Sequence, residues 1–126
     1  MFKTRFNVKL LTTAIFFTAA VLVFTHLPQE VIPSPLQKDG FDKLQHALAY
    51  GVITSLFLIS LRTSPTMLSA LLLFLVVSVI GAFDELTQPF VSRTASITDL
   101  VANSVGVLAA LFFFTVRGRW FLRSSP

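Results

Sequence analysis

Four long apolar runs, separated by short polar segments, dominate the chain. They cover about residues 8–27, 44–61, 67–88 and 97–116. Each is close to the ~20 residues that a helix needs to cross the ~30 Å hydrocarbon core of a bilayer. The apolar positions are continuous rather than alternating, which favours helices over strands. The pattern predicts an all-α, polytopic membrane protein with four transmembrane helices in one domain, residues 1–126.

Prolines mark the limits of these helices. Pro65 precedes the third run and Pro89 follows it, as expected for residues that cannot continue a helix. Between the first and second runs, the Pro-rich stretch PQEVIPSPLQKDG (residues 28–40) predicts a structured or extended loop outside the bilayer.

The first run has two interpretations. A basic start, with Lys3, Arg5 and Lys9, before an apolar stretch is also typical of a cleaved signal peptide. This stretch is longer than a usual signal-peptide core, and the following THLPQEV contains no small-residue cleavage pattern. We therefore expect the first run to be retained as a membrane helix.

Composition agrees with the membrane prediction and excludes several alternatives. The chain is 54% hydrophobic and only 13% charged, whereas soluble domains average about 25% charged residues. It has no cysteine, which excludes disulfides, thiolate chemistry and cysteine-based metal sites. The net charge of +4 does not indicate nucleic-acid binding, because no block of Lys and Arg with interleaved aromatic residues occurs.

Lys and Arg are instead distributed as in a membrane protein with a defined orientation. With a cytoplasmic N-terminus, seven basic residues lie on the cytoplasmic side: Lys3, Arg5, Lys9, Arg62, Arg117, Arg119 and Arg123. Three lie on the other side: Lys38, Lys43 and Arg93. The positive-inside rule then predicts that both termini are cytoplasmic and that both longer loops face outward. Trp120, just past the fourth run, fits an interfacial anchor.

This orientation brings polar residues of three runs to the outer side of the membrane. They are Asp42, Lys43, His46 and Tyr50 on the second run, Asp84, Glu85 and Gln88 on the third, Arg93 in the following loop, and Asp99 and Asn103 on the fourth. Many are four residues apart and therefore share a helix face. Small residues at Ala102, Gly106 and Ala110 allow the fourth helix to approach its neighbours closely. We expect the polar faces to point into the bundle.

Each residue also has a structural interpretation. Asp42 with Gln45, and Ser96 with Asp99, resemble helix capping boxes. Tyr50 has the character of a packed aromatic residue, and Asn103 that of an interhelical hydrogen-bonding residue. Arg93 has a structural role too, as a counter-ion for Asp84 or Glu85. The joint arrangement favours a functional pocket, because ionisable groups within membrane helices are expensive and usually mark a site.

The adjacent carboxylates of Asp84 and Glu85 are expected to divide their roles. Successive helical residues point about 100° apart, so both cannot face the same partner equally. We expect Glu85, which has the longer side chain and shares a face with Gln88, to line the pocket with His46. Asp84 is expected to be held by Arg93 or Asn103.

Two stretches together resemble the VanZ-like family of small bacterial membrane proteins. They are FDKLQHALAYG and GAFDELTQPFVSRTASITDLVANSVGVLAA, with an HLPQ segment before them. The family pattern falls on the ten residues above and on Gly106; RTASITD lacks a glycine that is often found there. The resemblance implies an integral protein of the bacterial cytoplasmic membrane, linked through the family's founding member to resistance against the glycopeptide teicoplanin. It implies no established reaction.

Two classes of function remain open. As a binding protein, the chain would hold an envelope lipid, a lipid-linked cell-wall precursor or an amphiphilic glycopeptide in the outer pocket. As an enzyme, it would use His46 and Glu85 or Asp84 as general acid and base on a lipid headgroup, with Lys43 and Arg93 holding an anionic group. The sequence indicates no cofactor, and His46 with carboxylates, as the one His of this set and without Cys, gives no recognised metal-ligand spacing. Binding is the favoured interpretation.

Overall fold

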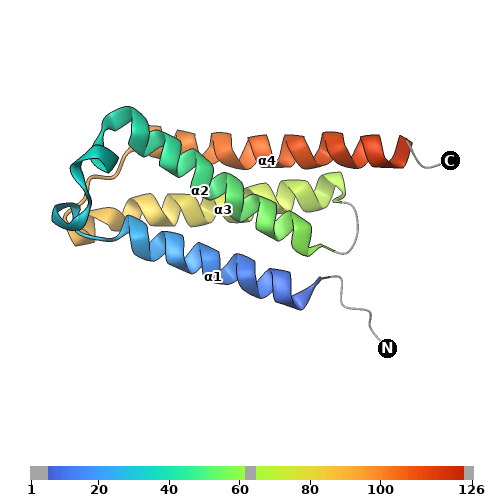
Figure 1. Cartoon of the computed structure of the whole chain (residues 1–126), viewed down its shortest axis with the longest axis horizontal. Coiled ribbons are helices and arrows are strands. Elements are labelled where there is room, and N and C mark those ends of the chain that lie inside the picture. The colour runs from blue at the N-terminus through green and yellow to red at the C-terminus, as the bar shows by residue number, and fades with distance from the viewer. Residues whose placement is uncertain (1–5, 62–64, 124–126) are drawn as a thin grey trace.

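Four α-helices run back and forth along a common axis (Figure 1). The computed structural model describes residues 6–61 and 65–123, with the backbone alone for Asp39 and residues 118–123. The helices are α1 (Val8–Thr25), α2 (Asp39–Ser60), α3 (Met67–Thr87) and α4 (Ile97–Arg123). Short 3-10 helices in the connections are η1 (Gln29–Val31), η2 (Ser34–Gln37) and η3 (Gln88–Val91). The predicted all-α architecture with four helices is confirmed.

Two helix boundaries differ from the prediction. α2 begins at Asp39 rather than near residue 44, and α4 continues to Arg123 rather than ending near 116. The prediction followed hydropathy, which marks the part of a helix that suits lipid. A helical backbone continues into water wherever its residues tolerate it, so the apolar run underestimates the length of the helix.

Side chains cap three of the helices. Asn7 Oδ1 accepts a hydrogen bond from the Leu10 amide at 3.4 Å, and Thr66 Oγ1 accepts one from the Ser69 amide at 3.2 Å. Ser96 Oγ accepts from the Asp99 amide at 3.4 Å at the start of α4. These contacts satisfy amides that have no partner within their own helix.

The backbones of α2 and α4 approach each other closely at two glycines. α2 packs most extensively against α4 and less against α1 and α3. A Cβ built on Gly51 would lie 3.3 Å from the Gly106 carbonyl oxygen, and a Cβ on Gly106 would overlap the Ala47 carbonyl. The predicted close approach of α4 is therefore confirmed at Gly106. Such contacts between small residues are typical of membrane helices.

The outward face of the bundle is apolar. The core consists of Tyr50, Ile53, Val77 and Val107, whereas large side chains on the other faces are exposed, as at Phe16 (75%), Val79 (68%) and Phe112 (72%). Three helical segments of the described chain are long and apolar enough to cross a membrane: Val8–Thr25, Met67–Val91 and Ile97–Arg117. α2 is less apolar because its first turns carry polar residues of the predicted site.

The two ends of the bundle differ in their connections. The Pro-rich segment between α1 and α2 and the segment between α3 and α4 lie at one end, which we call the loop end (Figure 1). The start of α1 and the end of α4 lie at the opposite end (Figure 1). Some residues of the predicted basic bias lie outside the described part of the chain: Lys3, Arg5, Arg62 and the side chains of Arg119 and Arg123. The side chain of Trp120, the predicted interfacial anchor, lies outside it too.

Candidate functional site

Buried polar side chains gather near the loop end of the bundle. Seven of the ten predicted site residues are buried: His46, Tyr50, Asp84, Glu85, Gln88, Asp99 and Asn103. The other three, Asp42, Lys43 and Arg93, are half-buried. A buried polar group without a partner costs ~1–3 kcal/mol, so the contacts within this cluster determine what it can do.

His46 on α2 connects the two neighbouring helices. Its Nδ1 lies 3.0 Å from Asn103 Oδ1 on α4 and 3.7 Å from Glu85 Oε1 on α3. An amide oxygen only accepts hydrogen bonds, so Nδ1 carries the hydrogen in this contact. The prediction that His46 faces a carboxylate of the third span is confirmed by the contact with Glu85. The expectation that Glu85 lines the pocket is not confirmed, because the cavity beside α1 is lined by His46 but not by Glu85.

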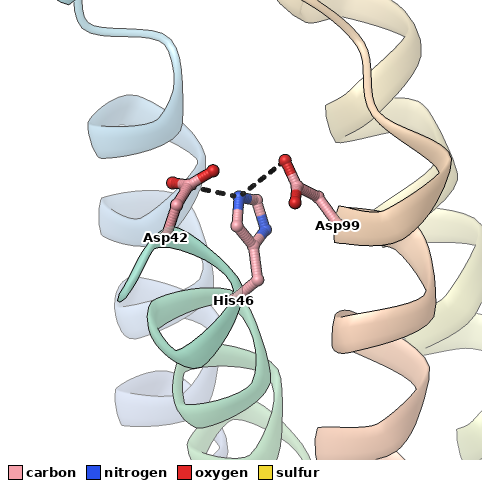
Figure 2. Close-up of side chains that lie close together, drawn as sticks. All are labelled: Asp42, His46 and Asp99. Carbon is pink, nitrogen blue, oxygen red and sulfur yellow. Dashed lines mark ion pairs between the residues drawn. The ribbon is translucent and has the colours of Figure 1, made fainter. Parts of the chain in front are cut away.

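The other ring nitrogen of His46 points at two further carboxylates (Figure 2). Nε2 lies 4.0 Å from Asp42 Oδ1, one helical turn earlier, and 3.8 Å from Asp99 Oδ2 on α4. Both distances exceed the 2.7–3.2 Å of a direct N–H···O hydrogen bond. The three side chains therefore surround a small space without closing it.

Glu85 joins α3 to the start of α4. Its Oε2 accepts a hydrogen bond from the Ser96 amide at 3.0 Å, and its Oε1 accepts one from Gln88 Nε2 at 3.3 Å. The Ser96 amide is the group that a capping box would give to Asp99. For the Asp99 side chain the capping interpretation is wrong, because Glu85 binds the Ser96 amide. The other half of the predicted capping box forms, since Ser96 Oγ accepts a hydrogen bond from the Asp99 amide.

The capping interpretation of Asp42 is also wrong. α2 begins at Asp39 with Lys38 as its N-cap, which places Asp42 inside the helix rather than at its cap. The carboxylates of Asp42 and Asp99 are thus available to face His46. Lys43 Nζ lies 3.6 Å from Asp99 Oδ1, so the two helices are also linked by an ion pair.

Asp84 is fully buried, but its partners differ from those predicted. Its Oδ1 accepts a 2.5 Å hydrogen bond from Thr25 Oγ1 and lies 3.4 Å from His26 Nδ1, both from the end of α1. Its Oδ2 accepts from the Tyr50 hydroxyl on α2 at 3.1 Å. The expectation that Arg93 or Asn103 holds Asp84 is wrong, because rotation around α3 directs this side chain towards α1 and α2.

Thr25 and His26 are site residues that sequence reasoning missed. Both lie where the first apolar run ends, directly before the Pro28 loop. Thr25 is buried, and His26 also contacts Thr87 Oγ1 through Nε2 at 2.8 Å. The sequence did contain one sign of this role. His26 is titratable and lies at the end of the first apolar run, on the same side of the membrane as the other polar groups.

A cavity opens between α1 and α2 beside this cluster. Its volume is about 390 Å³, within the 300–1,000 Å³ range of small-molecule sites. Apolar side chains line one part, including Val21, Phe24 and Ala49, and polar ones line the rest, including His46 and Arg93. Arg93 forms no ion pair with Asp84 or Glu85, whose contacts are with other residues. Its predicted role as their counter-ion is therefore wrong.

Comparison with protein families agrees with the resemblance seen in the motifs. A family model described as VanZ/LLP1 matches residues 2–119. The chain belongs to the VanZ/LLP1 family. Comparison with curated proteins and with solved structures finds no match. Membership of the VanZ/LLP1 family, together with the three apolar helices, identifies an integral membrane protein.

Proposed function

We propose that this VanZ/LLP1 protein binds an amphiphilic envelope molecule, a lipid or a lipid-linked cell-wall precursor, in the cavity between α1 and α2. The proposal rests on the lining of that cavity, which is apolar in one part and polar in another. Val21, Phe24 and Ala49 provide an apolar wall, and His46 and Arg93 provide polar groups beside it. A molecule with an acyl chain and a polar head matches both parts at once.

Charge favours an anionic head near Arg93. Arg93 is the basic residue among the described side chains that line the cavity. A guanidinium binds phosphate or carboxylate through paired hydrogen bonds, which a point charge does not provide. The carboxylates of Asp42, Asp84 and Glu85 oppose deep entry of an anion, so we place the head at Arg93 and the acyl chain along α1.

We further propose that the loop end faces outward from the bacterial cytoplasmic membrane, with both termini in the cytoplasm. All six acidic residues are on the outward side in this orientation, and seven of the ten Lys and Arg are on the cytoplasmic side. Reporter fusions after residue 126 and at Ser34 are expected to report opposite sides. The same side for both would contradict the orientation. In this position the pocket could hold an amphiphilic glycopeptide, which would connect the chain to teicoplanin resistance.

Filling the cavity tests the binding proposal. Ala49→Phe places a ring against the lining, whereas Ala109→Phe makes the same change at an exposed position of α4 outside it. Native mass spectrometry of the protein released from bacterial membranes should show a bound lipid in the parent and in Ala109→Phe, and a reduced bound fraction in Ala49→Phe. Equal lipid retention in all three proteins would contradict a site in this cavity.

A second candidate function, general acid–base catalysis on the headgroup, is favoured by one contact. The His46 ring and the Glu85 carboxylate are both buried and lie 3.7 Å apart, and an imidazole beside a carboxylate is a common acid–base pair. Mass spectrometry of lipids and cell-wall precursors from cells with and without the protein separates the two functions. Catalysis predicts a covalent species that appears or disappears when the parent protein is present, and that does not change when Glu85→Gln is present instead. Unchanged lipid species favour binding.

A further inference from the structure

We propose that Asp42, His46 and Asp99 form a binding site for one divalent transition-metal ion, for which Zn²⁺ is the test ion. The site joins the first turns of α2 to the first turn of α4 (Figure 2). It is independent of the lipid-binding proposal, because it rests on contacts within the protein alone.

The spacing of the three side chains suits a metal ion. Nε2 of His46 lies 4.0 Å from Asp42 Oδ1 and 3.8 Å from Asp99 Oδ2. One ligand atom from each residue lies within 4.8 Å of the other two. Zinc bonds of about 2.0–2.2 Å in tetrahedral geometry place ligand atoms roughly 3.4 Å apart. Small rotations of the two Asp side chains are sufficient to close the remaining difference.

The tautomer of His46 is set for metal binding. Its Nδ1–H donates to Asn103 Oδ1 at 3.0 Å, so in the neutral ring Nε2 carries the lone pair and faces the two carboxylates. Metal-binding histidines almost always donate their second ring N–H to an oxygen, and this contact fixes the ring. A cation between Nε2 and the two carboxylates would contact all three groups, which at 3.8–4.0 Å are too far apart for direct hydrogen bonds.

The carboxylate of Asp99, whose Oδ2 faces His46 Nε2, has a second oxygen without a hydrogen-bond partner. Asp99 is 5% exposed, and its Oδ1 has no hydrogen-bond partner among the described residues. The ion pair with Lys43 is 3.6 Å long, beyond hydrogen-bond distance. Nor does Asp99 serve in a cap, because the Ser96 amide is bonded to Glu85. Buried carboxylate oxygens are normally paired or bound to a metal.

A second group of possible ligands, His46 with Asp84 and Glu85, is a weaker candidate. Asp84 already accepts hydrogen bonds from Thr25 and Tyr50, and Glu85 accepts from the Ser96 amide and Gln88. The ring nitrogen nearest Glu85 is the one bonded to Asn103. These atoms are satisfied within the protein, whereas Asp99 Oδ1 has no hydrogen-bond partner among the described residues.

The donor set determines the class of metal. One imidazole nitrogen and two carboxylate oxygens suit Zn²⁺ or Mn²⁺ better than Mg²⁺ or Ca²⁺, which prefer oxygen ligands alone. Three protein ligands leave a coordination position open. Asp42 and His46 both line the cavity between α1 and α2. If the proposed function holds, the bound ion offsets the acidic charge of the pocket and attracts an anionic head.

Metal binding is tested on the whole purified chain in detergent, stripped with a chelator and dialysed against Zn²⁺ with excess Mg²⁺. Elemental analysis should find one Zn²⁺ per chain, and Zn²⁺ should raise the temperature of thermal unfolding. Asp99→Asn and Asp42→Asn should each weaken Zn²⁺ binding more than about 10-fold, since even residues behind the ligands change affinity ~10–100-fold. Glu30→Gln, which removes an exposed acid, should bind like the parent.

Three outcomes overturn the proposal. The first is a parent that binds no stoichiometric Zn²⁺. The second is binding that survives both Asp substitutions, which would mark an adventitious ion at another position. The third is loss of binding in Glu85→Gln while Asp99→Asn still binds, which would place the ion on the other side of the ring. Circular dichroism of each variant verifies the helical fold, and half-buried Asp42 supplies the test if Asp99→Asn unfolds.

Discussion

The helix α2 meets its neighbours α4 and α1 in opposite ways. Against α4 the backbones touch, since a Cβ on Gly106 would overlap the Ala47 carbonyl. Against α1 the same helix leaves a cavity of about 390 Å³. Glycines make one contact surface tight, while side chains of mixed polarity hold the other apart. The difference indicates that α2 and α4 form a close-packed pair that positions His46, whereas α1 forms one wall of the proposed binding site.

The largest loss of stability is expected from a methyl group added where the backbones of α2 and α4 touch. Gly106→Ala forces α2 and α4 apart because the Ala47 carbonyl cannot give way without moving its helix. Overpacking of this kind costs ~1–3 kcal/mol and occasionally more. Thermal unfolding in detergent should show a marked loss of stability. Gly40→Ala, with no atom within 4 Å of the new Cβ, is the control and should be at least as stable as the parent, because alanine favours a helix more than glycine does.

Asp84→Asn should have the next largest effect, because Asp84 fastens α1 to α2 and α3. The carboxylate accepts from Thr25 and from Tyr50, whereas an amide presents an NH₂ group to one of these donors. Loss of a buried hydrogen bond to a charged group costs about 1.5–3 kcal/mol. We expect less folded protein and a lower unfolding temperature. Stability equal to that of exposed Glu30→Gln would show that Asp84 does not hold the helices together.

A smaller loss of stability is expected when the α1 partner of Asp84, Thr25, is changed. Thr25→Val removes the hydroxyl that donates to Asp84 and should cost about 1.5 kcal/mol, the low end for one hydrogen bond to a charged group, because Tyr50 still donates to the carboxylate. Thr18→Val is a matched control, because that hydroxyl bonds only to the Ala14 carbonyl of its own helix. Unfolding of the two variants should differ by the value of the contact between helices. Equal stability of Thr25→Val and Thr18→Val would indicate that the Thr25 hydroxyl does not hold α1 against α3.

The smallest effect is expected at Gly51. A Cβ there would lie 3.3 Å from the Gly106 carbonyl, a contact that a shift of a few tenths of an ångström relieves. Gly51→Ala should cost under about 1 kcal/mol in the same unfolding assay. A loss as large as that of Gly106→Ala would mean that the two helices are equally tight at both glycines.

The helices were predictable from the sequence because continuous apolar runs leave few alternatives. The extra turns of α2 and α4 were not, since hydropathy reports lipid contact and not backbone conformation. Spacing of four residues correctly placed polar groups of three helices on common faces. The contact of His46 with Glu85 at 3.7 Å agrees with that expectation.

The partners within the site were harder to predict. Whether Asp84 meets Arg93 or Thr25 depends on the rotation of α3 and on the depth to which α1 packs, and neither is encoded in local spacing. Asp42 and Asp99 resembled caps, but Asp42 lies inside α2 and Glu85 takes the amide that Asp99 would cap. Thr25 and His26 were missed because a single polar pair at the end of a span carries no periodic signal.

The direct test of an amphiphile site between α1 and α2 is an experimental structure of the protein in lipid at a resolution that shows bound lipid. We expect density for a headgroup beside Arg93, with an acyl chain that follows Val21 and Phe24 on α1. The carboxylate of Glu85 should remain next to His46. A cavity filled by its own side chains, with His46 turned towards the surrounding lipid, would contradict the proposed site.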